Sequence, residues 1–437
     1  MLFIHSSGAG DSETTKAVNN KAESEATIVA GKSEEMLAAF HERPQGAAVS
    51  LAGVRTALRL VAVCCILLAC AALATGAQTA EPELDKPTLA WMQAALDNWE
   101  AICRRHLHVA IEPLPWIIFY DESHAWHLNP EKELLPPHEA VPASLKFAGR
   151  ALTLMRVAHD RGLWVPGRAA LPVTPRAVTM LYADEQKPFF IIPLPSLYRK
   201  LAGADQSPAL DELFLGLACH ELAHTRQLVY AVQRINRLRA QHRLPESIDD
   251  DMIQHTFGAK DDYRRLYEEE RGHLMRAILA DDPAACRRAL AQALSVSQQR
   301  KKRFFVGDYE GYSELDDIFL AMEGLGMWVH YQMARDHAPA GEDWRQTAVS
   351  LSEKTAALWS QEEGIGLFLL IDRLVPGWQA RFLAPDFPSP FAVLREAVRK
   401  RAPLSPAVRS RKKRKKSNGS MYQWTMKQNR SGGNYER

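Results

Sequence analysis

The chain has 437 residues, of which 46% are hydrophobic and 24% are charged. These proportions are typical of a globular protein and exclude an intrinsically disordered chain. The formal net charge of +2 gives no indication of a nucleic-acid partner for the chain as a whole. Six cysteines are present, and Cys64, Cys65 and Cys70 share one apolar stretch, so the sequence does not describe a disulfide-rich scaffold.

The N-terminal region divides into a polar extension and a short apolar run. Residues 1–53 are rich in Ser, Glu, Ala and Gly without a sustained period, so we expect a disordered extension. Residues 54–77 combine basic residues, an apolar run and small residues, the three parts of a secretory signal peptide. The alternatives are a membrane anchor over 60–77, a lipoprotein signal ending at Cys70, and a buried core helix. The signal-peptide and anchor interpretations both predict an exported protein that is periplasmic, secreted or membrane-anchored.

Residues 78–403 are expected to form one domain. Apolar residues at helical spacing predict a helix over 87–107, and short apolar runs predict strands over 116–120, 177–182 and 188–193. Long helices are expected beyond Asp211, over 209–242, 262–280, 283–303, 314–336, 344–359, 362–373 and 389–400. The predicted fold class is α+β, with a small N-terminal mixed sheet followed by a mainly helical half.

Residues 404–437 form a basic tail. Arg411 to Lys416 are six consecutive basic residues, and a Ser, Asn, Gly and Gln-rich end follows them. Such a block is typically solvated and disordered. The alternative is binding to a nucleic acid or an anionic membrane surface by charge alone, without sequence-specific recognition.

The strongest chemical signal is the sequence His220-Glu221-Leu222-Ala223-His224. Residues four apart lie on one face of a helix, so both imidazoles can turn toward one metal ion. Zn²⁺ suits neutral histidine nitrogens and leaves a position open for water, and Glu221 can accept a proton from that water. Apolar residues flank the motif at helical spacing. The alternative is two histidines that are satisfied by hydrogen bonds inside a helical core.

These residues resemble the zincin metallopeptidases. The metzincin branch is excluded, because residues 225–230 lack the Gly and the third His of that pattern. The chain is more similar to the gluzincins, and that resemblance implies a third zinc ligand from a Glu on a later helix. Glu323, in the segment Glu323-Gly324-Leu325, matches that position, and Glu270 is the rival candidate. The gap to Glu323 is long for a gluzincin, and Met327 stands where the family carries an acid.

Several further residues have predicted roles around this site. Asp316 lies seven residues before Glu323 and is expected to orient a ligand histidine as a hydrogen-bond acceptor. The candidate hydrogen-bond donors to the oxyanion of the transition state are Tyr309, Tyr312 and His330. The resemblance also implies a sheet edge along the cleft where a substrate backbone pairs, and residues 188–194 are the candidate strand.

The sequence thus predicts an exported zinc-dependent hydrolase, specifically a metallopeptidase that cleaves peptide or protein substrates with a water activated by Glu221. One alternative is a catalytically silent zincin-like binding protein of the cell envelope. Another is an anchored protein whose basic tail binds anionic surfaces and whose motif is accidental. The substrate preference and the oligomeric state have no signal in the sequence.

Overall fold

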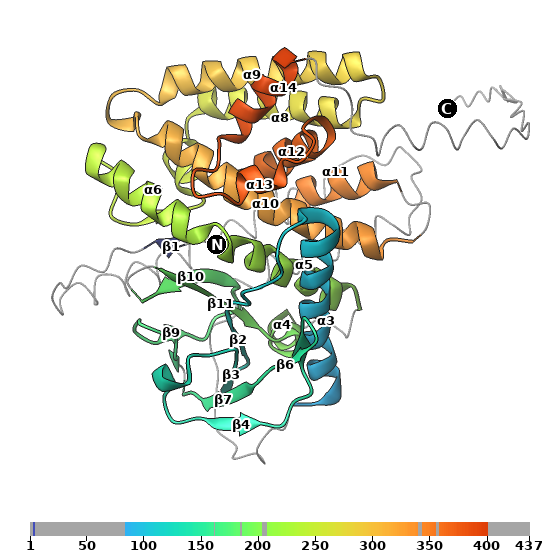
Figure 1. The fold of residues 1–437 in the computed structure, drawn as a ribbon. Helices are drawn as coiled ribbons and strands as arrows, with labels where there is room; N and C mark the ends of the chain where they lie inside the picture. The colour runs from blue at the N-terminus through green and yellow to red at the C-terminus, as the bar shows by residue number, and fades with distance from the viewer. Residues whose placement is uncertain are drawn as a thin grey trace, which may run out of the picture.

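A mixed β-sheet forms the first half of the described chain, and helices form the second half (Figure 1). The computed structural model describes residues 3–4, 84–160, 162–183, 186–202, 208–339, 343–354 and 358–400. The predicted α+β class, with an N-terminal mixed sheet followed by a helical half, is confirmed. Apart from Phe3–Ile4, the predicted extension 1–53, the signal 54–77 and the tail 404–437 lie outside the described residues.

The main sheet has six strands in the order β10-β11-β2-β3-β7-β4. Their bounds are β2 Trp116–Tyr120, β3 His124–Leu128, β4 Glu139–Val141, β7 Leu154–Ala158, β10 Val178–Tyr182 and β11 Lys187–Pro193. The β2–β11 pair is parallel and the other pairs are antiparallel. The three predicted strands are present as β2, β10 and β11. Strands β3, β4 and β7 were not predicted, because short strands among Pro and His residues give a weak periodic signal.

The expectation that residues 188–194 form the sheet edge is wrong. Strand β11 pairs with β10 on one side and with β2 on the other, so Phe189 lies opposite both Met180 and Trp116. The edge strand on this side is β10, because the tight turn after Tyr182 folds β11 back between β10 and the rest of the sheet. Any backbone that extended the sheet here would therefore approach β10.

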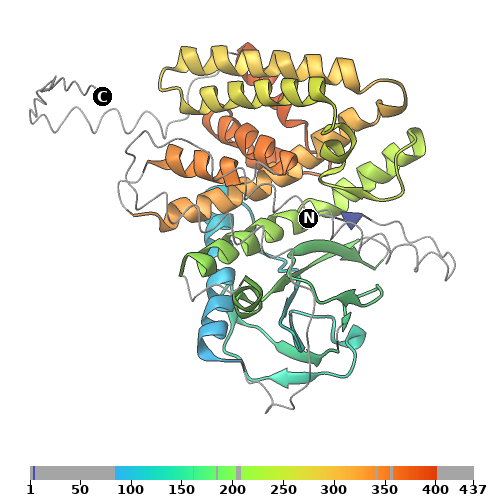
Figure 2. The ribbon, with the colours of Figure 1, turned by 180° about the vertical axis from the view of Figure 1, so that it is seen from behind.

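Three short strand pairs lie outside the main sheet. They are β5 Lys146–Phe147 with β6 Arg150–Ala151, β8 Gly162–Leu163 with β9 Leu171–Pro172, and β1 Phe3–Ile4 with β12 Ile248–Asp249. Strand β1 lies beside β10, at the same free edge of the main sheet (Figures 1 and 2).

The first helix of the domain, α3 Lys86–Ile102, packs against α5 at the side of the sheet (Figure 1). Asp85 caps it by accepting a hydrogen bond from the backbone N–H of Thr88, and Pro87 stands in the first turn, where its missing N–H costs nothing. A π-helical turn, Cys103–Leu107, continues α3, as the prediction over 87–107 required. The turn ends at His108, which has a left-handed φ of 56°.

The region 209–242 was expected to be one helix and instead forms two, α5 Pro208–Thr225 and α6 Leu228–Gln241. The chain turns at Arg226 and Gln227, whose side chains donate hydrogen bonds to backbone carbonyls that are remote in the sequence. Arg226 donates to the carbonyls of Ala110 and Ile111, and buried Gln227 donates to the carbonyl of Phe382. Contacts of this kind arise only in the folded chain, so helical periodicity did not reveal the break.

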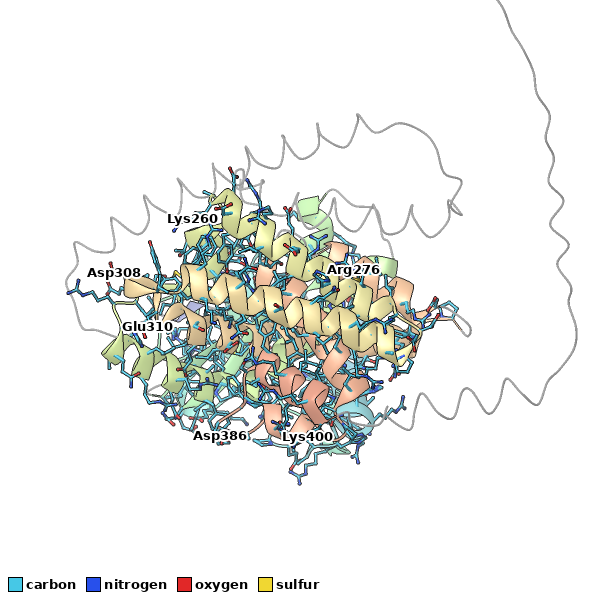
Figure 3. All side chains as sticks on the ribbon, turned by 90° about the horizontal axis from the view of Figure 1, so that it is seen from above. Lys260, Arg276, Asp308, Glu310, Asp386 and Lys400 are labelled. Atoms are coloured by element: carbon cyan, nitrogen blue, oxygen red, sulfur yellow. The ribbon has the colours of Figure 1, made fainter. Side chains whose placement is uncertain are left out.

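The helical half is built on α10, which packs against α5 on one side and α12 on another. The remaining helices are α4 Pro195–Ala202, α7 Met252–Phe257, α8 Asp261–Leu279, α9 Pro283–Phe304, α10 Tyr312–His337, α11 Trp344–Lys354, α12 Trp359–Leu374, α13 Gln379–Phe382 and α14 Pro390–Lys400. The predicted ranges correspond to α8, α9, α10, α12 and α14, and α11 covers the first part of the predicted range 344–359, of which residues 355–357 lie outside the described part of the chain. The short helices α4, α7 and α13 were not predicted. The α8–α9 hairpin crosses the top of this half, with Lys260 and Arg276 near the ends of α8 (Figure 3).

No helix among these described segments is long and apolar enough to cross a membrane. The predicted anchor over 60–77 is not among them, so it stays a prediction.

Helices α10 and α12 approach each other at a pair of glycines. A Cβ atom placed on Gly364 would lie 2.7 Å from both Gly324 Cα and Gly324 N, which is closer than real Cβ contacts allow. A Cβ on Gly324 would in turn lie 2.8 Å from the Gly364 carbonyl oxygen and 2.5 Å from Phe368. The two backbones therefore touch directly at Gly324, next to Glu323.

Replacing Gly364 with Ala should lower the free energy of unfolding by about 1–3 kcal/mol, the typical cost of overpacking a tight core. Gly366→Ala on the same helix is the matched control, because its Cβ would meet its neighbours at an ordinary 3.8 Å. The control should be neutral or stabilising, by up to about 1 kcal/mol of helix propensity. Urea unfolding followed by tryptophan fluorescence measures both changes, and equal effects would contradict the close approach.

Candidate metal centre

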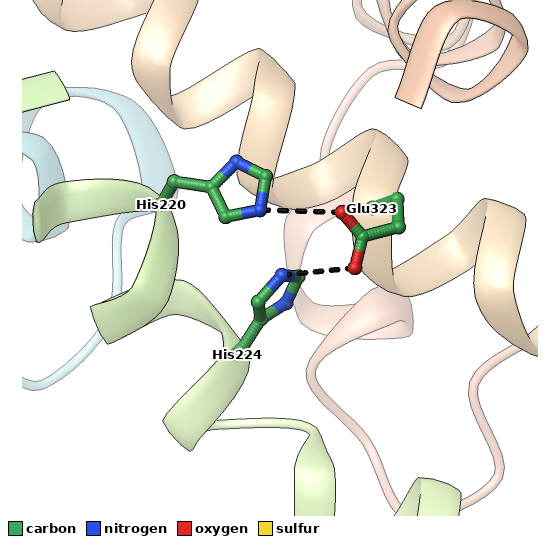
Figure 4. Close-up of side chains that lie close together, drawn as sticks. All are labelled: His220, His224 and Glu323. Atoms are coloured by element: carbon green, nitrogen blue, oxygen red, sulfur yellow. Dashed lines mark ion pairs between the residues drawn. The ribbon is translucent and has the colours of Figure 1, made fainter. Parts of the chain in front are cut away.

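Helices α5 and α10 bring three side chains together in the middle of the molecule. His220 and His224 stand one turn apart on α5, and Glu323 faces them from α10 (Figure 4). His220 Nε2 lies 3.3 Å from Glu323 Oε2, and His224 Nε2 lies 3.2 Å from Glu323 Oε1. One ligand-type atom of each residue lies within 4.8 Å of the other two. The carboxylate thus faces both imidazoles with one oxygen each.

The donor set fits a tetrahedral zinc site. Zinc–ligand bonds of about 2.0–2.2 Å at tetrahedral angles put neighbouring ligand atoms about 3.4 Å apart, close to the two His–Glu separations. All three residues are no more than 2% exposed. Within the described structure, both ring nitrogens of His224 and Oε1 of Glu323 make no hydrogen bond, although His224 Nε2 and Oε1 are close. Buried polar atoms without hydrogen bonds are rare and are expected where an ion binds.

The electrostatics of the three groups agree with a cation-binding role. Burial alone would raise the pKa of Glu323, but the two imidazoles outweigh it and hold that pKa well below its usual range. Burial alone would lower the pKa of His224, but Glu323 outweighs it and raises that pKa. Burial and the neighbouring His224 lower the pKa of His220. The carboxylate therefore stays ionised and needs a positive partner, which is either a proton on His224 or a metal ion that displaces it.

Two glycines let the imidazoles lie against helix backbones. A Cβ on Gly326 of α10 would lie 2.7 Å from the His220 ring, so the absence of a side chain there makes room for the imidazole. A Cβ on Gly216 of α5 would lie 2.2 Å from the ring of His330. The candidate oxyanion donor His330 thus packs on α5 one turn before His220, and it is buried.

Glu221 projects from α5 toward the sheet. Its Oε2 lies 2.6 Å from Thr179 Oγ1, and the Thr179 hydroxyl is also 3.0 Å from the Glu221 carbonyl oxygen. A hydroxyl has one proton to donate, and the shorter contact to the carboxylate is the better hydrogen bond. Thr179 stands on β10, the edge strand of the sheet. The motif is therefore held from the helical side by Glu323 and from the sheet side by Thr179.

Sequence reasoning missed Thr179, Gln361 and Gly326. Gln361 on α12 donates a hydrogen bond from Nε2 to Glu323 Oε2 over 3.1 Å. Thr179 lies inside a predicted strand, but nothing in the sequence indicated which strand would face Glu221. Gly326 was visible within the segment after Glu323, and a glycine one helical turn beyond a ligand was the available signal.

The rival ligand Glu270 belongs to a different buried cluster. Its Oε2 accepts a hydrogen bond from Arg300 Nε at 2.8 Å, and Arg300 Nη2 donates to Glu363 at the same distance. Tyr263 also contacts the guanidinium. Glu270 is fully buried and lies on α8, whose three consecutive acids were expected to mark a solvated face. The Glu270 carboxylate is hydrogen-bonded to Arg300, and Glu270 does not belong to the candidate metal-binding group of His220, His224 and Glu323.

Three other predicted residues lie away from the imidazoles. The expectation that Asp316 orients a ligand histidine is wrong, because its Oδ2 lies 3.2 Å from Lys301 Nζ. Tyr312 directs its hydroxyl toward Met252 Sδ, 3.9 Å away. Tyr309 is partly exposed and its ring packs on Phe257. Within the described residues, no contact of Tyr309 or Tyr312 with His220, His224 or Glu323 is found.

Comparisons with protein-family models, with curated proteins and with solved structures found no match for this chain. The chemistry of the site therefore has to be argued from its own residues. Two imidazoles and one carboxylate can hold a divalent ion and leave a fourth position, and the Glu221 charge acts on both imidazoles.

Glu270→Gln should lower the free energy of unfolding by about 3 kcal/mol or more, because it removes the charge of one partner and leaves Arg300 buried with less compensation. Glu268→Gln on the same helix is the matched control, because Glu268 is exposed, and its effect should stay within about 0.5 kcal/mol. Chemical unfolding of the two variants beside the parent chain checks this. Similar stabilities would show that the Arg300 pair contributes nothing.

Proposed function

We propose that the protein is a zinc-dependent hydrolase of the zincin type, and that it cleaves peptide bonds. The observation that carries the proposal is the meeting of the two motif histidines with Glu323 across α5 and α10. A coincidental His-Glu-x-x-His sequence has no reason to face a buried carboxylate from a helix about a hundred residues away. Export through the apolar segment at 60–77 remains part of this proposal.

The proposed chemistry assigns each residue one task. His220, His224 and Glu323 would hold the ion, and a bound zinc ion would polarise the substrate carbonyl and lower the pKa of a coordinated water to about 7. Glu221 accepts the proton of the attacking water and delivers it to the leaving nitrogen. The C–N bond breaks, a C–O bond forms, and the products are a carboxylate and an amine.

Thr179 is proposed to position Glu221. Its hydroxyl fixes one carboxylate oxygen at 2.6 Å and leaves the other oxygen to meet the water. Thr179 also ties the general base to β10, the strand next to which a substrate backbone would lie. A shift of that strand would therefore move the base together with the substrate.

A second candidate function is a closed, structural zinc site in a binding protein. The observation that favours it is burial: His220, Glu221, His224 and Glu323 are each no more than 2% exposed. Structural zinc sites are closed, whereas catalytic sites keep one position open to water.

Metal analysis of the purified chain tests the ligand set. The parent chain should carry about one zinc ion, and the zinc should be lost in His224→Ala and in Glu323→Ala. Glu270→Gln should keep the zinc, because the Glu270 carboxylate pairs with Arg300 and not with the ion. Parent protein that binds no zinc after reconstitution would exclude both candidate functions.

Peptide hydrolysis tests the role of Glu221. Glu221→Gln should keep its zinc and lose about 10²–10⁴-fold in kcat, the usual contribution of a general base. Thr179→Val should cost roughly 10- to 100-fold, the value of a hydrogen bond to a charged group, with zinc retained. Thr179→Ser keeps the hydroxyl and should restore most of kcat. Full turnover by zinc-loaded Glu221→Gln would rule out the mechanism, and a zinc-loaded parent chain without activity would favour the structural site.

A further inference from the structure

The two carboxylate oxygens of Glu323 have different surroundings. Oε2 accepts a hydrogen bond from Gln361 Nε2 over 3.1 Å and lies 3.3 Å from His220 Nε2. Oε1 faces His224 Nε2 at 3.2 Å (Figure 4) and makes no hydrogen bond within the described part of the chain. An ionised carboxylate only accepts hydrogen bonds, so the Gln361 amide has to turn its nitrogen toward it. The two oxygens are therefore not equivalent as ligand atoms.

An ion bound by Oε1 would satisfy this carboxylate better than an ion bound by Oε2. Binding by Oε1 gives a partner to the oxygen that has no hydrogen bond and keeps the Gln361 bond on the other oxygen. Binding by Oε2 would put the ion and the amide on one oxygen and leave Oε1 buried without a partner, which folded proteins rarely tolerate. The 3.2 Å between Oε1 and His224 Nε2 also fits neighbouring ligands of one zinc ion, which lie about 3.4 Å apart.

Gln361 reaches Glu323 because α12 lies directly against α10. A Cβ on Gly364, one helical turn after Gln361, would lie 2.7 Å from Gly324, the residue that follows Glu323. The two helices therefore touch through their backbones at this level, and Gln361 stands in the first turn of α12. The hydrogen bond between the two side chains is thus a consequence of the glycine contact.

The first turn of α12 is itself fixed on both sides of Gln361. The backbone N–H of Trp359 donates to Gln254 Oε1 over 3.1 Å, and the Glu362 carboxylate accepts from the Tyr267 hydroxyl over 3.0 Å. These partners belong to α7 and α8. A side chain that starts from a fixed turn can hold a neighbouring carboxylate in one orientation, as the hydrogen-bonding partners of metal ligands do.

The amide of Gln361 orients Glu323 without compensating its charge. Glu270 differs in this respect, because the guanidinium of Arg300 donates to its carboxylate over 2.8 Å and brings a positive charge to it. An amide donates a hydrogen bond but carries no net charge, so the negative charge of Glu323 stays available to a cation. A glutamine is therefore suited to orienting a metal ligand, whereas an arginine in its place would compete with the ion.

We propose that Gln361 is a positioning residue of the metal centre, which holds Oε2 so that Glu323 binds the ion through Oε1 alone. A carboxylate that binds through one oxygen leaves the fourth position of a tetrahedral site to water, whereas a carboxylate that binds through both oxygens occupies that space. The inference rests on the proposed zinc hydrolase and deepens it, because it names the residue that keeps the water position open.

Two variants of the full chain remove this hydrogen bond by different routes. Gln361→Met keeps the size of the side chain and removes the donor, and Gln361→Asn keeps the amide and shortens its reach. Both should lower the affinity for zinc about 10- to 100-fold, the usual effect of losing a hydrogen-bond partner of a metal ligand. Competition against a fluorescent zinc chelator measures the affinity.

Gln379→Met is the matched control, because Gln379 is also partly buried and donates a hydrogen bond over 3.1 Å, but to the backbone carbonyl of His106. It should keep the zinc affinity of the parent chain. Zinc affinity that is unchanged in both Gln361 variants, or lowered equally in Gln379→Met, would overturn the inference.

Cobalt substitution separates a change in ligand geometry from a general loss of stability. Co²⁺ absorbs visible light strongly in a four-coordinate site and weakly in a site with more ligands. The cobalt-saturated parent chain and Gln379→Met should both show the strong bands. The cobalt-saturated Gln361 variants should lose most of that intensity, because the released Oε2 joins the coordination. A parent chain without the strong bands, or strong bands retained by the Gln361 variants, would overturn the inference.

The same proteins separate this inference from the hydrolase itself. A zinc-loaded parent chain that cleaves peptides, beside Gln361 variants with parental bands, would keep the hydrolase and refute the role of Gln361. Bands lost in the Gln361 variants of a zinc-loaded parent chain that cleaves no peptide would refute the hydrolase and leave Gln361 as the residue that orients a ligand of a structural site. A parent chain that binds neither zinc nor cobalt would refute both.

Discussion

The structure depends on a buried carboxylate that faces two imidazoles. Moving an ionised carboxylate out of water costs several kcal/mol unless a cation and hydrogen bonds compensate it. Glu323 has two histidines on one side and the Gln361 amide on the other. Gly326 admits the His220 ring, and the Gly324–Gly364 contact brings α12 close enough for Gln361 to reach. The close packing of α5, α10 and α12 thus brings together the groups that compensate the charge of Glu323.

Helix α5 joins the two halves of the molecule at the same point. Its motif residues turn in two directions, with His220 and His224 toward α10 and Glu221 toward Thr179 on β10. The helix is apolar all round and buried along the motif, as a helix between two layers must be. The groups proposed to bind the ion and to accept the proton therefore belong to one helix, while the residues that contact them come from opposite layers. Such fixed groups are the preorganisation that the proposed hydrolysis would require.

The second buried polar cluster, around Arg300, has a different character. Its guanidinium is paired with Glu270 and Glu363, so the positive charge is compensated within the protein itself. The Glu323 cluster carries histidines whose charge depends on protonation or on a bound ion. Of these two clusters, the one around Glu323 is the one whose charge could be completed by an external ion.

The sequence by itself determined the fold class, three strands of the main sheet, the long helices from α8 onward and the helical setting of the motif, because apolar periodicity and His spacing on one helix are local properties. It singled out Glu323, but it ranked Glu270 as a rival, since a single chain does not show which distant helix faces α5. It also placed Asp316 beside a ligand histidine and residues 188–194 at the sheet edge, and both were wrong. Tertiary structure alone decided these points, because strand order, the burial of Arg300 and the turn at Gln227 follow from contacts between residues remote in the chain.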